Sequence, residues 1–195
     1  MNGSLNLVTG PTVEPVSLAE AKLHLRVDIN DDDVFISSLV ETVRIQLERQ
    51  YDTAFVNQSW DWYLDTFPNT SFEIPLWPLS SVTSIKYTDE DDSESTYSSD
   101  NYRVDTASKP GRVILKTAKS WPSVTLKEHN GVVIRFVAGY GAGSTSVPAP
   151  IRQAIKLMVG DLYENRENVL IAQGVTVSNL QIERVLMANY RGFNV

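Results

Sequence analysis

The sequence predicts an α+β protein: a small helical bundle formed by both chain ends, with an inserted antiparallel β-rich sandwich or barrel. Three observations support this prediction. Apolar residues recur at helical spacing near both ends, the middle of the chain alternates apolar and polar residues, and turn-forming residues separate the alternating runs. We therefore predict a helical core from residues 1–53 and 148–195, and a β-rich insertion at 54–147.

Two helices are predicted in the first of these segments. Pro11 and Pro15 favour an extended arm at the start of the chain, because proline disfavours helix. Ser17 and Glu20 then have the spacing of a capping box, in which the Ser17 hydroxyl accepts from the Glu20 N–H and the carboxylate reaches back. A short helix should therefore begin after Ser17.

A longer helix should begin at the acidic run Asp31-Asp32-Asp33, since carboxylates favour the positive end of a helix dipole and can cap its free N–H groups. Its apolar residues step by three and four positions and form one stripe, made of Ile36, Val40, Val43, Leu47 and Tyr51. The charged residues between them are expected to face away from the stripe, namely Glu41, Arg44, Glu48 and Arg49.

The middle of the chain has the two-residue period of strands. Trp60 and Trp62 should share one face of a strand and Asp61 the other. The acidic run 89–93 predicts a hairpin tip. Other strand candidates are Ser71–Leu76, Ser80–Thr88, Tyr97–Val104, Gly111–Lys116 and Val132–Ala138. About six or seven short strands at this spacing are typical of a small antiparallel sandwich or barrel.

The last part of the chain returns to helical spacing. Gly139–Ser146 is predicted to be a flexible linker, and Pro148 fits the first turn of a helix. The apolar stripe of that helix is Ile151, Ile155, Met158 and Leu162, and the helix should run to about Glu167. A last short helix or turn is expected from Ser178 to Ala188.

Composition excludes several kinds of site. The chain has 195 residues, no cysteine and two histidines, so disulfides, thiolate metal sites and cysteine nucleophiles are excluded, and no metal or cofactor site is expected. The net charge of −7 disfavours clamping of DNA, because phosphate binding needs clustered Lys and Arg. No apolar run is long enough to span a membrane, and the first residues lack the pattern of a signal peptide, so no membrane contact is expected.

No segment carries a recognisable catalytic motif, so we predict that the protein is not an enzyme and name no catalytic residue. The glycine-rich loop Gly139–Gly143 does not open a helix as a dinucleotide loop must. The acidic runs 31–33 and 89–92 lack the ligand order of a calcium loop. Asp61 and Asp65 share a strand face, but nothing places them across a cleft as glycoside hydrolysis requires.

The tryptophans allow an alternative function. Trp60, Trp62, Trp77 and Trp121 could form the platform of a β-sandwich recognition module, such as a sugar-binding or tail-fibre component on a helical mount. Tryptophans on alternating strands more often belong to the core of a small sandwich.

Several segments, taken in order, resemble a known family. Pro15–Val27 with the acidic run at 31–33, and Pro148–Ile155 with Leu162–Glu167, resemble the helices of head–tail connector (adaptor) proteins of long-tailed phages, prophages and gene transfer agents. The middle resembles the longer members, with landmarks at 102–105 and 136–141. The residues that carry the resemblance in the helices are Ser17, Glu20, Asp31, Asp32, Ile151, Tyr163, Glu164, Asn165 and Arg166.

The resemblance implies a structural role in a virion. Such adaptors form a ring, usually of twelve copies, beneath the portal; DNA passes through the ring without specific binding, and a stopper protein and then the tail are mounted on it. It implies location at the head–tail interface of the virion, and in the host cytoplasm during assembly. Tyr190–Val195 matches the segment that contacts the portal in several relatives, with Tyr190, Arg191 and Phe193 as candidate contacts. The aromatic residues of this segment are expected to lack local partners.

Overall fold

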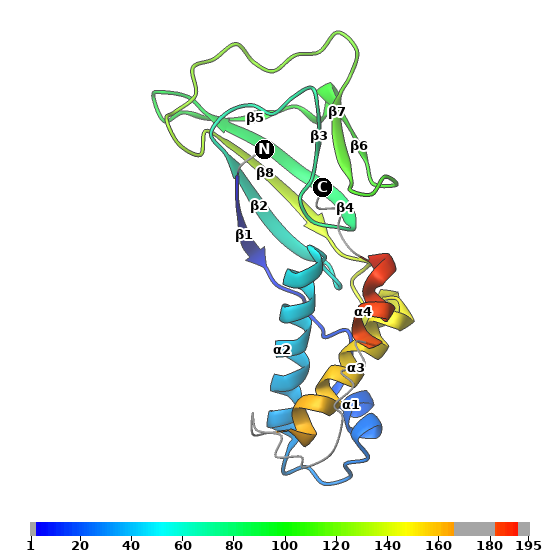
Figure 1. The fold of residues 1–195 in the computed structure, drawn as a ribbon. Coiled ribbons are helices and arrows are strands. Elements are labelled where there is room, and N and C mark those ends of the chain that lie inside the picture. The colour runs from blue at the N-terminus through cyan, green and yellow to red at the C-terminus, as the bar shows by residue number, and fades with distance from the viewer. Residues whose placement is uncertain (1–2, 166–181, 191–195) are drawn as a thin grey trace, which may run out of the picture.

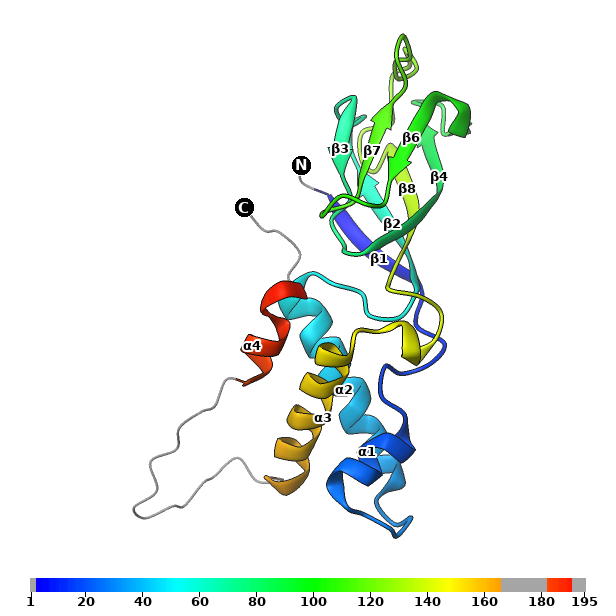
Figure 2. The ribbon, with the colours of Figure 1, turned by 90° about the vertical axis from the view of Figure 1, so that its right-hand side faces the viewer.

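The computed structural model describes residues 3–165 and 182–190. Two parts are visible along the long axis of the molecule, with sheets at one end and helices at the other (Figures 1 and 2). The helices are α1 (Leu18–Leu25), α2 (Asp33–Tyr51), α3 (Ala149–Glu164) and α4 (Ile182–Met187), with 3₁₀ turns at Ser99–Asn101, Ser144–Ser146 and Ala188–Tyr190. The strands are β1 (Ser4–Thr9), β2 (Gln58–Leu64), β3 (Ser71–Glu73), β4 (Leu79–Thr88), β5 (Glu94–Tyr97), β6 (Tyr102–Asp105), β7 (Arg112–Leu115) and β8 (Val132–Ala138).

The strands form two antiparallel sheets. The larger has the order β1-β2-β8-β4-β5, and the smaller has the order β3-β7-β6. β8 lies at the centre of the larger sheet, where Ile134 pairs with Trp62 of β2 and with Ile85 of β4. Alternate β8 residues are buried, as the two-residue period predicts. The α+β class is thus confirmed, and the sheets do not close into a barrel.

Each part has its own hydrophobic core. The sheets enclose the first core, in which Trp62, Phe72 and Phe136 are buried. The second lies among α1, α2 and α3, where Ile36, Leu47 and other residues of the α2 stripe meet Ile151 and Ile155 of α3. Deep burial of these aliphatic and aromatic side chains supplies the main driving force for folding in each part.

Several boundaries differ from those predicted. The arm at the start of the chain contains β1, which pairs with β2, so residues 4–9 run along the sheet while α1 and α2 lie in the helical part. The predicted strand Tyr97–Val104 is divided between β5 and β6 by a 3₁₀ turn. α3 ends at Glu164 rather than near Glu167. The division of the chain at residues 53 and 147 stays a prediction.

The predicted linker at 139–146 is hydrogen-bonded to other segments at its start, and its flexibility stays a prediction. The Gly139 N–H donates to Pro78 O at 2.8 Å, and the Tyr140 N–H donates to Phe55 O at 3.0 Å. The Asn57 N–H in turn donates to Gly141 O at 2.9 Å. The start of this segment is therefore held against the connection between α2 and β2, and it joins the two parts closely.

Candidate functional site

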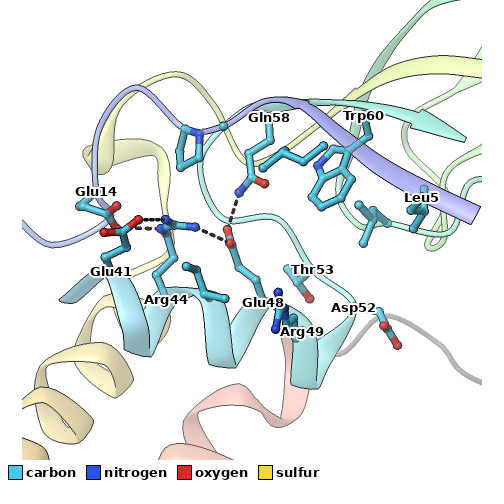
Figure 3. Close-up of a pocket in the computed structure, with 15 residues that line it drawn as sticks. Leu5, Glu14, Glu41, Arg44, Glu48, Arg49, Asp52, Thr53, Gln58 and Trp60 are labelled. Carbon is cyan, nitrogen blue, oxygen red and sulfur yellow. Dashed lines mark hydrogen bonds and ion pairs between the residues drawn. The ribbon is translucent and has the colours of Figure 1, made fainter. Parts of the chain in front are cut away.

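A pocket of about 550 Å³ lies between β1, β2 and the second half of α2 (Figure 3). β1 and β2 form one wall and α2 the other. The lining residues are Leu5, Leu7, Gly10, Pro11, Glu14, Glu41, Arg44, Ile45, Glu48, Arg49, Asp52, Thr53, Gln58, Trp60 and Leu76.

An ionic network forms one end of the pocket. Arg44 of α2 donates from Nε to Glu14 Oε2 and from Nη1 to Glu48 Oε2, both at 2.8 Å. The other Glu48 oxygen accepts from the Phe55 N–H at 2.8 Å and from Gln58 Nε2 at 2.7 Å. Three segments distant in sequence are thereby joined: the arm after β1, α2 and the start of β2 (Figure 3).

Burial controls the electrostatics of this network. It raises the pKa of Glu48 above its ordinary value, although hydrogen bonds from Phe55 and Gln58 and the charge of Arg44 act in the opposite direction. Burial alone would lower the pKa of Arg44, but its two carboxylate partners raise it. Each charge of the pair thus offsets part of the cost of burying the other.

Sequence reasoning missed this network. Glu41 and Arg49 are exposed, as predicted, but Arg44 is only 6% exposed and the Glu48 side chain is 11% exposed. Both lie on the face of α2 that the arm and β2 cover. The helical period of α2 alone does not indicate that this second face is covered. The available signal was the Arg44–Glu48 pair at i, i+4, which is compatible with exposure as well as burial.

The rest of the pocket is suited to hydrophobic contact. Leu5 and Leu7 of β1 are 38% and 45% exposed. The Trp60 indole N–H is buried and has no hydrogen-bond partner among the residues that the structure describes. Away from the ionic network, the lining is therefore mainly apolar.

Two of the predicted motif residues join α1 to α3. The capping box is present: the Ser17 N–H donates to Glu20 Oε2 at 3.0 Å, and the Glu20 N–H donates to Ser17 Oγ at 3.3 Å. The second Glu20 oxygen accepts from Arg152 of α3, whose Nε also donates to Pro15 O. The Glu20 carboxylate therefore stabilises both the start of α1 and its packing on α3.

We expect Glu20→Gln to lower the free energy of unfolding by about 1 kcal/mol at neutral pH, because the negative charge at the start of α1 and facing Arg152 is lost, while the Gln oxygen can still accept from the Ser17 N–H. The Ser17 N–H hydrogen bond is the main cause of a pKa of Glu20 below its ordinary 4.5. The ionised Glu20 carboxylate therefore stabilises the folded state above pH 4.5, and this stabilisation is lost as the pH falls through the lowered pKa of the folded state. Urea unfolding at pH 7 and along an acid series measures this. Glu164→Gln, at an exposed residue, is the control; equal unfolding of both variants at pH 7 would refute the assignment.

Other motif residues lie at the far end of the bundle. Asp32 is the N-cap residue of α2 without a side-chain cap, and its carboxylate instead accepts from Tyr163 Oη of α3 at 2.5 Å. Asp31 is exposed. Ile151 lies at the opposite end of α3 from Tyr163, and it is fully buried in the helical core. Glu164 is the exposed last residue of α3, and Asn165 caps that helix by donating to Asp161 O at 3.0 Å. Arg166 lies outside the described residues.

Tyr190 corrects an expectation about the chain end. Its ring packs against the helical core and lies 6.4 Å from the ring of Tyr140, and its carbonyl accepts from Thr53 Oγ1 at 3.0 Å. Tyr190 thus has local partners, contrary to our expectation, and Thr53 lines the pocket. Arg191 and Phe193 lie outside the described residues. The role of all three as portal contacts stays a prediction.

The groups considered for sugar binding or hydrolysis have structural contacts. Trp121 stacks on Phe67 at 5.2 Å between ring centroids and donates from Nε1 to Pro68 O at 2.6 Å. Asp61 accepts two hydrogen bonds from Arg135, and Asp65 accepts one from the Asn130 N–H. Within residues 3–165 and 182–190 no cluster of side chains could hold a metal, and no helix could cross a membrane.

The fold matches chains of solved gene transfer agent particles over nearly its full length. A chain from the neck of an empty particle, computed with C6 symmetry, has a TM-score of 0.80 and 21% identity, and the match covers 98% of this chain and 97% of that chain. A chain from the virion of a native particle has a TM-score of 0.80 and 21% identity, with 98% and 96% covered. A chain from the neck of a native particle, computed with C12 symmetry, has a TM-score of 0.79 and 21% identity, with 98% and 97% covered.

No protein-family model and no curated protein matches the sequence. The likeness therefore defines a class by fold: a helical bundle with a two-sheet β part, as it occurs in those neck chains. The α+β architecture of this chain is thus similar to that of the matched gene transfer agent chains.

Proposed function

We propose that this chain is a structural, non-enzymatic subunit of a virion neck, and specifically a head–tail adaptor. Copies form a ring, with twelve as the expected number, under the portal. DNA passes through the ring without specific binding, and a stopper protein and then the tail attach to it. The protein would act at the head–tail interface of the virion and be present in the host cytoplasm during assembly.

One observation carries the proposal: the whole chain, including the β part, superposes on neck chains with a TM-score of 0.80 and 98% coverage. The solved necks were computed with C6 and C12 symmetry, which supports a ring. The helical segments that carry the sequence resemblance form one bundle in space. The net charge of −7 also suits a conduit, because acidic surface repels DNA and lets it slide.

The direct test is to mix the purified protein with its cognate portal and examine the product by electron microscopy. We expect averaged images to show an added ring beneath the portal, with twelvefold symmetry. Removal of residues 191–195 tests the predicted contacts at Arg191 and Phe193 and should weaken attachment, while Tyr190 stays anchored on Thr53. An intact portal that acquires no density from the protein would refute the adaptor assignment.

A further inference from the structure

β1 is an unusual edge strand. It ends the larger sheet, and nothing in the described part of the chain pairs with its outer edge. All of its residues are exposed. Its sequence, Ser-Leu-Asn-Leu-Val-Thr, holds no charge and no proline, the devices that usually protect an edge from pairing with another chain. Such an edge is expected to be covered in the assembled state.

The pocket continues this surface toward α2. Leu5 and Leu7 contribute to both, so the exposed strand and the apolar lining form one face. The pocket lining carries four carboxylates, Glu14, Glu41, Glu48 and Asp52, against two guanidinium groups, Arg44 and Arg49. Its charged rim is therefore net acidic. We call the strand and the pocket together the β1–α2 face.

β6 and β7 lie at the other side of the β part from β1 (Figure 1). Arg103 projects from β6, the edge strand of the smaller sheet, and is exposed. Lys116 and Lys119 follow β7, the strand paired with β6. None of these three cations has an ion pair among the described residues. We call this surface the β6–β7 face.

We propose that the β1–α2 face of one copy receives the β6–β7 face of the next copy. The inference rests on the proposed function, since a ring requires each copy to contact its neighbours through two different surfaces. The two faces are complementary in charge, lie on opposite sides of the β part and are both edges of sheets. The apolar residues of β1 become buried in the contact, and Arg103 lies toward the acidic rim.

Cross-linking tests the contact directly, because the chain has no cysteine of its own. Leu7→Cys and Arg103→Cys are made in separate chains, mixed, assembled on the portal and treated with a short bifunctional maleimide. We expect cross-linked dimers from this mixture. Val34→Cys mixed with Arg103→Cys is the control, since Val34 is 85% exposed at the start of α2, away from the pocket; it should give no dimers.

Substitution gives an independent measure. Leu7→Arg should weaken self-association of the free protein at least about tenfold, because it replaces an apolar contact by a cation that faces Arg103 of the next copy. Val34→Arg should leave self-association unchanged. Thermal unfolding of each variant shows that the chain still folds.

The outcomes separate this inference from the proposed function. Rings that form on the portal without the Leu7–Arg103 cross-link overturn the contact and leave the adaptor assignment standing. Cross-links from Leu7→Cys to the portal would also overturn the proposed contact, because the portal would then cover the β1–α2 face. Self-association that rises when residues 191–195 are removed would overturn it as well, because the chain end would then cover that face. If no ring forms, weaker self-association of Leu7→Arg still supports the proposed contact. Self-association that Leu7→Arg leaves unchanged overturns the contact.

Discussion

Gly139→Ala should lower the free energy of unfolding by about 3 kcal/mol or more. Gly139 has φ of 141°, a backbone conformation that alanine rarely adopts. A Cβ there would lie 2.5 Å from Asn57 N and 2.6 Å from Asn57 Cα, so it would meet backbone atoms, which cannot move aside as a side chain can. The substitution would separate the segment after β8 from the connection between α2 and β2. Urea unfolding followed by tryptophan fluorescence measures the loss.

Gly143→Ala is the matched control in the same connection. Gly143 has φ of −111°, and an added Cβ would have its nearest neighbour at 3.8 Å, an ordinary van der Waals distance. Alanine there should leave the stability unchanged within about 0.5 kcal/mol or raise it slightly, since it restricts the unfolded chain. If both variants unfold at the same urea concentration, the close approach at Gly139 does not hold.

Arg44→Met should cost about 3 kcal/mol of stability at neutral pH. Methionine retains the length of the side chain but removes the charge that faces Glu14 and Glu48. Glu48 would remain buried beside Phe55 and Gln58 as a carboxylate without its cation. The loss follows from this uncompensated charge, and thermal or urea unfolding measures it.

The deficit of Arg44→Met should shrink as the solution becomes acidic. Burial raises the pKa of Glu48 above the ordinary 4.5, so the folded state binds a proton more readily than the unfolded state. The ionised group therefore costs stability as the pH rises above 4.5 through the folded value, and this cost is larger without Arg44. Unfolding of variant and parent from pH 4 to 7 should show the two curves converging at the acid end.

Glu41→Gln controls for the loss of a charge on the same helix. Glu41 contacts Arg44 only at 3.9 Å, and its side chain is 61% exposed. Its removal should change stability by less than about 0.5 kcal/mol. An Arg44→Met deficit that matches this control, or that stays constant with pH, would contradict the role assigned to the network.

The sequence predicted the local features that are determined by neighbouring residues. The Ser17–Glu20 capping box depends on a spacing of three positions, and it is present. The α2 stripe and the alternation along β8 depend on the helical and strand periods, and both bury the expected residues. These features follow from short-range geometry, which a single sequence contains.

The contacts that join the two parts could not be predicted in the same way. Arg44 is buried because β2 and the arm cover one side of α2, and Gly139 is fixed because residues 55–57 lie against it. β1 finds β2 across about fifty residues of chain, and Tyr190 meets Thr53 at a far greater separation. Each of these contacts depends on how distant segments are arranged in space, and local periodicity carries no information about that arrangement.

The order of strands in the larger sheet also determines when this sheet can be completed during translation. β2 and β4 do not pair with each other; each pairs with β8, which is the last of the described strands to emerge from the ribosome. Until residues 132–138 are translated, the nascent chain carries two strands with open edges that await a partner. Ribosome-bound fragments that end before β8 would therefore present the stage at which this protein is most exposed to aggregation and most in need of a chaperone.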